Sequence, residues 1–322
     1  MNGGPVRLSA LAIGAAVGWA AERLVMRRVD LAAAPSEPLP LPAAAVDRAM
    51  VMRDGASMHW IEAGEGRPLI LLHGITLEAE AWTRQFALAD RSRVMAIDLR
   101  GHGRSTAGTD GATIAANAGD LAELLEREDL HDAVIAGHSM GGMVLAHFLA
   151  TAPASTVQRV SSAVFVDSAI RSPMSPSLRS ERLDAFLQRP AVAAVVGTVP
   201  DSDAGRLAVM TTFGRRPSTL DLQTVAQSFD RLDPETYWQA MPSILDHDVR
   251  AAIAERSDLD RVEVAVIVGS LDRLTPMRCA RELVDVFPGS TLHVLDGVGH
   301  QAMMEAPAAV NEVLAGLLDH PA

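Results

Sequence analysis

The sequence predicts an α/β protein whose sheet is mostly parallel and is covered by helices on both faces. Apolar runs that are typical of buried strands recur along the chain, and segments with helical spacing separate them. Strands that are apolar almost throughout and alternate with helices indicate a parallel sheet. Residues 171–258 break this alternation with helical signals and no convincing strand. They are too long for a loop and are expected to form a small inserted helical subdomain.

The strands are expected in the following order. AVDRAMVMRD (45–54) and ASMHWIEAG (56–64) meet at Gly55 and predict an antiparallel hairpin on the sheet. Buried strands are expected within residues 68–74, 93–105, 131–139, 160–169, 262–272 and 291–300. Helices are expected over residues 113–129, from about Ser139, over 276–287, and from near Pro307.

Residues 1–44 stand apart from this pattern. The apolar run at 8–21 is shorter than the roughly 20 residues that span a bilayer. Three interpretations stay open: a short anchor or membrane-surface helix over residues 8–26, a cleaved signal peptide, and a helix docked on the domain. The first and third give a cytoplasmic or membrane-associated protein, and the second a secreted one. Residues 32–43 are rich in Pro and Ala and predict a linker.

The expected domain organisation follows from these segments. Residues 1–44 form the N-terminal apolar segment and linker, 45–170 and 259–322 form the core, and 171–258 form the helical insertion.

Charge and cysteine content exclude several function classes. With a net charge of −12, the chain offers no basic face for a phosphate backbone, so no nucleic-acid partner is expected. The single cysteine, Cys279, excludes an internal disulfide and a thiolate metal cluster. The ten histidines show no metal-ligand spacing, so neither a metal nor an organic cofactor is expected. The oligomeric state stays open.

The stretch GHSMGG (137–142) follows a predicted strand and crowds glycines around Ser139. A serine on a very tight strand-to-helix turn adopts strained backbone angles and points its hydroxyl away from the sheet. The residues two before and two after it must then be nearly free of side chain, which Gly137 and Gly141 satisfy. The N–H of Met140 lies at a helix N-terminus, where it can donate to a developing oxyanion. Ser139 is therefore a candidate nucleophile, with an idle serine in a glycine-rich turn as the alternative.

A serine nucleophile needs a base, and the base needs an orienting acid. Asp272 and His300 each follow a predicted strand, at the same sheet edge as Ser139 and in the order that such a site requires. Histidine suits the base because its pKa lies near neutrality. Gly74 lets the loop after an early strand turn inward, so that the Ile75 N–H can serve as a second oxyanion donor.

In this light the chain resembles the α/β-hydrolase superfamily over residues 45–320. Five motifs carry the resemblance: His73-Gly74, DLRGHGRS (98–105), GHSMGG (137–142), GSLDRLTP (269–276) and GVGHQAMMEAP (297–307). The resemblance implies an eight-stranded, mostly parallel sheet with a helical cap inserted after the sixth strand. It also implies a triad of Ser139, Asp272 and His300. Ile75 and Met140 would then form the oxyanion hole.

Other polar residues near these motifs compete for the same roles. Some relatives carry their acid at the position of Asp167, although the surroundings of Asp272 match the commoner pattern. His138 should point away from the nucleophile along the turn. His102 is expected to support its loop. Asp296 and Glu305 flank His300 and are expected at most to contact the site residues, not the substrate.

The resemblance implies a serine hydrolase that acts on a small, apolar carboxylic ester. Serine at the turn argues against haloalkane dehalogenases and epoxide hydrolases, which need a carboxylate there. Carbon–carbon bond hydrolysis or peracid formation by a perhydrolase remain alternatives with the same residues, and a non-catalytic ligand-binding member is the alternative from another class. The expected substrate pocket comprises His73, Gly74, Phe186, Met210, Phe213, Trp238 and Met241. The cap residues in this set could instead form the cap's own core.

Overall fold

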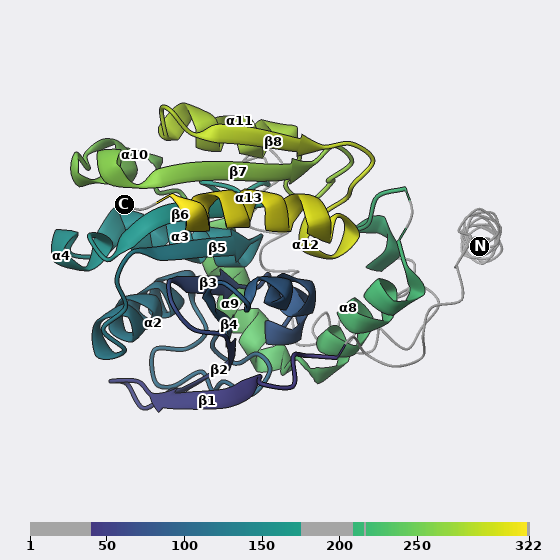
Figure 1. Ribbon diagram of the computed structural model, residues 1–322, viewed down its shortest axis with the longest axis horizontal. Helices are drawn as coiled ribbons and strands as arrows, with labels where there is room; N and C mark the ends of the chain where they lie inside the picture. Colours follow the sequence, from purple (N-terminus) through teal and green to yellow (C-terminus); the bar gives the residue numbers. More distant parts are fainter. Residues whose placement is uncertain (1–39, 175–208, 216, 321–322) are drawn as a thin grey trace, which may run out of the picture.

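A single sheet of eight strands organises the molecule (Figure 1). The computed structural model describes residues 40–174, 209–215 and 217–320. The strands are β1 (Val46–Val51), β2 (Ser57–Ala63), β3 (Pro68–Leu72), β4 (Arg93–Asp98), β5 (Ala133–His138), β6 (Val160–Val166), β7 (Glu263–Gly269) and β8 (Thr291–Leu295). They lie in the order β1-β2-β4-β3-β5-β6-β7-β8. Strand β2 is antiparallel to both of its neighbours, and all other pairs are parallel. The predicted sheet and its N-terminal hairpin are confirmed.

The central strands are mostly apolar and fully buried because helices cover both faces of the sheet. In β3, Leu69 and Leu71 pack into one hydrophobic cluster, and Ile70 and Leu72 pack into the other. This alternation is the two-residue period of a strand. All four side chains are buried.

Each face has its own set of helices. The described helices are η1 (Ala79–Leu88), α2 (Ile114–Arg127), α3 (Met140–Thr151), α4 (Ala154–Val157), α8 (Thr219–Arg231), α9 (Pro234–Leu245), α10 (Arg250–Ala254), η3 (Asp258–Arg261), α11 (Met277–Val286), α12 (Ala302–Glu305) and α13 (Pro307–Asp319). Helices α2, α3 and α11 share one core cluster, and η1, α12 and α13 share the other. In Figure 1, α13 crosses the near face, while β1 and β8 form the two edges.

The chain leaves the sheet after β6 and returns to it at β7. Helices α8, α9 and α10 lie in this interval. Where the chain leaves and returns, Arg171 and Asp248 form an isolated antiparallel bridge. The Ser172 N–H donates to the His247 carbonyl at 2.7 Å. The limits of the predicted insertion stay a prediction, because residues 175–208 and 216 lie outside the described residues.

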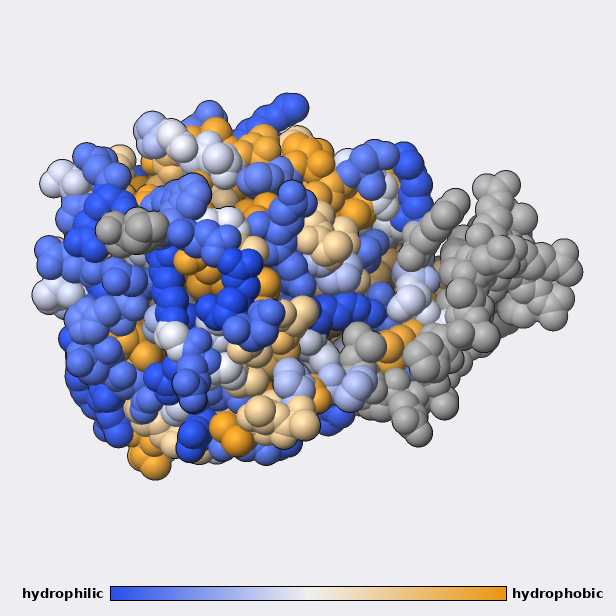
Figure 2. All heavy atoms as spheres, viewed as in Figure 1, coloured by the Kyte–Doolittle hydropathy of each residue, from blue (hydrophilic) through white to orange (hydrophobic). Residues whose placement is uncertain are grey.

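Strand β8 is an edge strand and leaves apolar side chains exposed. Leu292 and Val294 are 38% and 48% exposed, and Figure 2 shows hydrophobic surface over this strand. No helix of the described ranges is long and apolar enough to cross a membrane. The apolar segment 8–26 lies outside those ranges.

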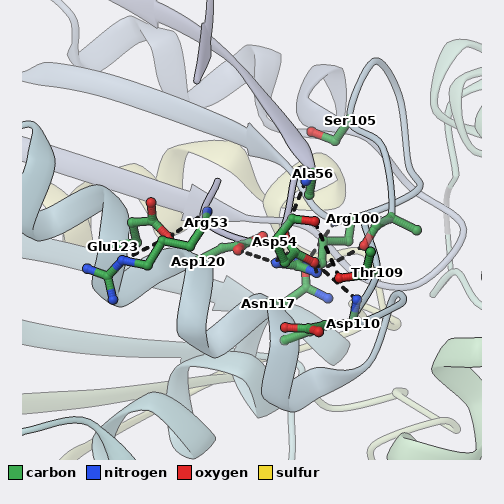
Figure 3. Close-up of polar contacts among 12 residues, drawn as sticks. Arg53, Asp54, Ala56, Arg100, Ser105, Thr109, Asp110, Asn117, Asp120 and Glu123 are labelled. Carbon is green, nitrogen blue, oxygen red and sulfur yellow. Dashed lines mark hydrogen bonds and ion pairs between the residues drawn. The ribbon is translucent and has the colours of Figure 1, made fainter. Parts of the chain in front are cut away.

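A buried ion cluster joins the N-terminal hairpin to α2 and to the loop after β4 (Figure 3). The Arg100 guanidinium contacts Asp120 at 2.6 Å through both Nε and Nη2, and contacts Asp54 at 2.6 and 3.0 Å. Burial opposes the charge on Arg100, but the two carboxylates outweigh it and raise the pKa. These contacts fix the loop that contains the DLRGHGRS motif.

Replacing Arg100 with methionine is therefore expected to destabilise the fold. The change leaves Asp120, which is 4% exposed, in the interior without its cation. Removing one partner of a buried ion pair costs about 3 kcal/mol or more. Arg53→Met is the matched control, because the Arg53 side chain is 75% exposed and its ion pairs contribute less than about 1 kcal/mol. Urea unfolding of both variants tests this, and equal midpoints would contradict it.

Candidate active site

Ser139 forms the turn between β5 and α3 in a strained backbone conformation. Its φ and ψ are 51° and −116°, in a region that residues with a side chain rarely adopt. Neighbouring backbone holds the turn in place: the Ser139 N–H donates to the Val166 carbonyl at 3.0 Å. The Ser139 carbonyl accepts from the Gly142 N–H at 3.0 Å. Within the described residues, the Ser139 hydroxyl makes no hydrogen bond, and the residue is partly exposed.

The glycines around Ser139 permit close backbone contacts. A Cβ atom on Gly137 would overlap the carbonyl of Gly141, and one on Gly141 would overlap the carbonyl of Leu72. A Cβ on Gly142 would meet the Ser168 side chain. The crowding of glycines in the sequence therefore reflects a turn packed tightly against β3 and β6.

His300 and Asp272 form a buried hydrogen-bonded pair at the carboxyl ends of the last two strands. His300 Nδ1–H donates to Asp272 Oδ2 at 2.9 Å. Asp272 is oriented in turn by Thr275, whose hydroxyl donates to Oδ2 at 2.6 Å and whose N–H donates to Oδ1 at 3.0 Å. These contacts leave Nε2 of His300 as the ring nitrogen that can accept a proton.

Neighbouring groups favour the ionised forms of both His300 and Asp272. Burial alone would lower the pKa of His300, but the carboxylates of Asp272, Asp167 and Glu305 outweigh it and raise the pKa above its ordinary value. Burial would raise the pKa of Asp272, but the His300 imidazole and the hydrogen bonds from Thr275 lower it.

His138 links the serine turn to His300. Its Nε2–H donates to the His300 carbonyl oxygen at 2.7 Å, and the two ring centroids lie 4.9 Å apart. The expectation that His138 points away from the nucleophile stays a prediction; its ring packs on the His300 imidazole. Burial, and next the charge of His300, lower the pKa of His138 to about 3, so this ring stays neutral.

Asp167 follows β6 and, among the described residues, makes no hydrogen bond to the His300 ring. Its two carboxylate oxygens accept from the backbone N–H groups of Gly269 and Ala302, at 2.8 and 2.9 Å. It therefore ties the end of β7 to the start of α12. Burial, and then the charge of Asp272, raise the pKa of Asp167.

The loop after β3 lies against the serine turn. A Cβ on Gly74 would come within 2.8 Å of His138 Nδ1 and 3.0 Å of Ser139 Cβ. Thr76 has a φ of 68°, which turns the loop sharply. Within the described residues, neither the Ile75 N–H nor the Met140 N–H has a hydrogen-bond acceptor. Both donors are thus available to a ligand.

Hydrogen bonds of His73 join the loop after β3 to the loop after β4. His73 Nε2 accepts from the Leu99 N–H at 2.9 Å, and His73 Nδ1–H donates to the Gly74 carbonyl at 2.8 Å. Both ring nitrogens of His73 are thus occupied by the protein. His102 Nδ1–H donates to the Arg100 carbonyl at 2.9 Å, which matches the expected support of its loop.

The predicted pocket residues lie in different surroundings. Phe213 is buried in the core cluster of η1, α12 and α13, and Met241 packs against the other cluster. Met210 and Trp238 are half-buried, and Phe186 lies outside the described residues. Their assignment to a substrate pocket stays a prediction.

A metal centre and a reactive thiol are two other kinds of site that the described residues could have formed. Among those residues, no group of three or more His, Cys, Asp or Glu side chains could hold a metal ion. Burial raises the pKa of the Cys279 thiol to about 11, so it stays protonated at neutral pH.

Comparison with known proteins adds family information to this geometry. The sequence model described as alpha/beta hydrolase family matches residues 69–313. An uncharacterised protein of Mycobacterium tuberculosis is 30% identical over 272 residues, which are 80% of this chain and 76% of that protein. A non-heme chloroperoxidase of Streptomyces lividans is 30% identical over 277 residues, 80% of this chain and 94% of its own. Among solved structures, an esterase from Exiguobacterium antarcticum has a TM-score of 0.73 at 19% identity and covers 84% of this chain and 99% of its own.

Proposed function

Because the chain belongs to the alpha/beta hydrolase family, we propose that it is a serine hydrolase that cleaves small, apolar carboxylic esters. One observation carries the proposal. Ser139 lies in a strained turn at the end of β5, and its neighbour His138 donates to the carbonyl of His300, whose ring is hydrogen-bonded to Asp272. A nucleophile, a base and an orienting acid in this relation are what acyl transfer requires.

In the proposed mechanism the Ser139 hydroxyl attacks the ester carbonyl while His300 Nε2 takes its proton. Asp272 holds the imidazole by Nδ1–H and stabilises the imidazolium. The tetrahedral intermediate collapses when His300 returns the proton to the leaving alkoxide, which leaves as an alcohol. Water then attacks the acyl-enzyme with His300 as base again, and releases the acid and free Ser139.

The oxyanion of each tetrahedral intermediate needs donors that are already in place. The N–H groups of Ile75 and Met140 suit this role, because they have no acceptor among the described residues and because Gly74 packs on Ser139. Met140 also begins α3, whose N-terminus favours negative charge.

Turnover of a series of p-nitrophenyl esters, from acetate to palmitate, tests the proposed function. We expect measurable hydrolysis with one preferred chain length, since a pocket of fixed size accommodates one range of acyl groups. Absence of hydrolysis across the series, in a folded protein, would favour the ligand-binding alternative.

Peracid formation is a second candidate, favoured by the likeness to a non-heme chloroperoxidase. Hydrogen peroxide would replace water in attacking the acyl-enzyme, and the products would be a peracid and free Ser139. Acetate and peroxide together, with halide oxidation as the readout, distinguish this activity from ester hydrolysis.

The activity should depend on pH through His300, which must be neutral to accept the proton. Because neighbouring carboxylates raise the pKa of His300 above 6.5, kcat/KM should fall with decreasing pH through a midpoint above 6.5. A pH–rate profile with a p-nitrophenyl ester measures this midpoint. A midpoint below 6.5 would contradict the described electrostatics.

A further inference from the structure

Residues 209–215, here named the cap segment, pack directly on residues 297–302, here named the base loop. The backbone N–H of His300 donates to the Thr212 carbonyl at 2.6 Å, and the Arg215 N–H donates to the Gly297 carbonyl at 2.9 Å. The cap segment thus supplies the acceptor for the main-chain N–H of His300, while His138 supplies the donor for its carbonyl.

The Glu305 carboxylate accepts hydrogen bonds from both segments. Its Oε2 accepts from the Gly214 N–H of the cap segment at 2.7 Å. Its Oε1 accepts from the base loop, from the N–H groups of Gly299 at 2.9 Å and Gln301 at 3.3 Å. The donors of Gly299 and Gln301 immediately flank His300, so one carboxylate bridges the cap segment and both neighbours of the base.

Glycines make the contact too close for any side chain. A Cβ on Gly214 would overlap the Gly297 carbonyl oxygen and lie 2.7 Å from the Gly299 nitrogen. A Cβ on Gly299 would overlap backbone atoms at Phe213 and Gly214. Any shift of the cap segment must therefore be transmitted to the base loop.

We propose that Glu305 is a positioning residue that couples the cap segment to His300, so that the base is aligned only while the cap segment is docked. This inference rests on the proposed serine-hydrolase function. Met210, a residue of the predicted pocket, lies in the same segment and is half-buried, so an acyl group that contacts it would bear on the segment that holds the base. Substrate binding against the cap segment would therefore be coupled to the alignment of His300.

The variant Glu305→Gln tests the coupling. The amide has the same size, but its NH2 group must face backbone N–H donors on one of the two segments. We expect kcat for a short p-nitrophenyl ester to fall roughly tenfold to a hundredfold, because small misplacements of a base have effects of this size. KM should change less than about twofold, since substrate contacts are kept. The acid limb of the pH profile should move to lower pH, because the Glu305 carboxylate raises the pKa of His300.

Asp296→Asn is the matched control. This carboxylate lies beside the same base loop and contacts Arg215 of the cap segment at 3.3 Å, but its side chain is 82% exposed. We expect its kcat and pH profile to equal those of the wild type. Equal kcat and pH profiles for Glu305→Gln and the wild type would overturn the coupling. A loss that merely follows the folded fraction, with the acid limb unmoved, would overturn it as well.

A second pair of variants tests the same contact without altering charge. Gly214→Ala places a methyl group against Gly297, whereas Gly316→Ala places the same group where nothing lies within 4 Å. We expect Gly214→Ala alone to lower kcat, and equal rates for the two would overturn the proposal. Ser139→Ala, measured alongside, separates the two hypotheses: if that variant stays active, the proposed function fails whatever Glu305 does.

Discussion

Replacing Ser139 with alanine is expected to lower kcat for an ester by about 10⁶-fold, to the level that binding and the oxyanion donors sustain alone. The change removes the only atom that forms the acyl-enzyme in the proposed mechanism. It leaves the turn in place, because Val166 and Gly142 hold it through backbone atoms.

Ser290→Ala is the control for this variant. Ser290 lies at the amino end of β8, whereas Ser139 lies at the carboxyl end of β5. Steady-state kinetics and thermal unfolding of both variants give the comparison. A folded Ser139→Ala protein with wild-type turnover would show that the chemistry lies elsewhere.

Replacing Asp272 with asparagine is expected to lower kcat by about 10⁴-fold. The amide cannot stabilise the imidazolium, and its NH2 group facing Nδ1 would place the imidazole proton on Nε2, where it blocks proton transfer from Ser139. Thr275 can still hold the side chain, so the loss should appear in kcat more than in stability.

Asp167→Asn distinguishes the two carboxylates that lie near His300. Asp167 contacts the backbone at Gly269 and Ala302 and makes no hydrogen bond to the His300 ring, so its replacement should cost far less activity than that of Asp272. If Asp167→Asn gave the larger loss in kcat, the orienting acid would be Asp167.

Much of the fold follows from local patterns in the sequence. Apolar runs located six strands, and the two segments that meet at Gly55 located β1 and β2. The helix predicted over 113–129 appears as α2, with Thr113 accepting from the Ala116 N–H as its N-cap. The element η1 was not predicted, because its 3₁₀ turns lack the 3.6-residue period of an α-helix. The exposure of Leu292 and Val294 was also not predicted, because an apolar run does not reveal that its strand lies at the sheet edge.

For the candidate site too, the sequence indicated some residues but not the contacts between them. Ser139, Asp272 and His300 follow strands in a recognisable order, so sequence alone indicated them. The contacts of His138 with His300 and of Gly214 with Glu305 join residues 162 and 91 positions apart, and no local spacing encodes them. Gly297 and Gly299 on either side of Val298 were the one signal of a close backbone approach. Such contacts arise from how two loops pack, which is a property of the tertiary structure.

The mass of the intact protein after brief treatment with a fluorophosphonate tests the central claim most directly. A nucleophilic serine displaces fluoride from the probe, so the proposed function predicts one adduct per chain, located on Ser139 by peptide mapping and absent from Ser139→Ala. An adduct on another residue, or an unmodified protein that still hydrolyses esters, would contradict the account.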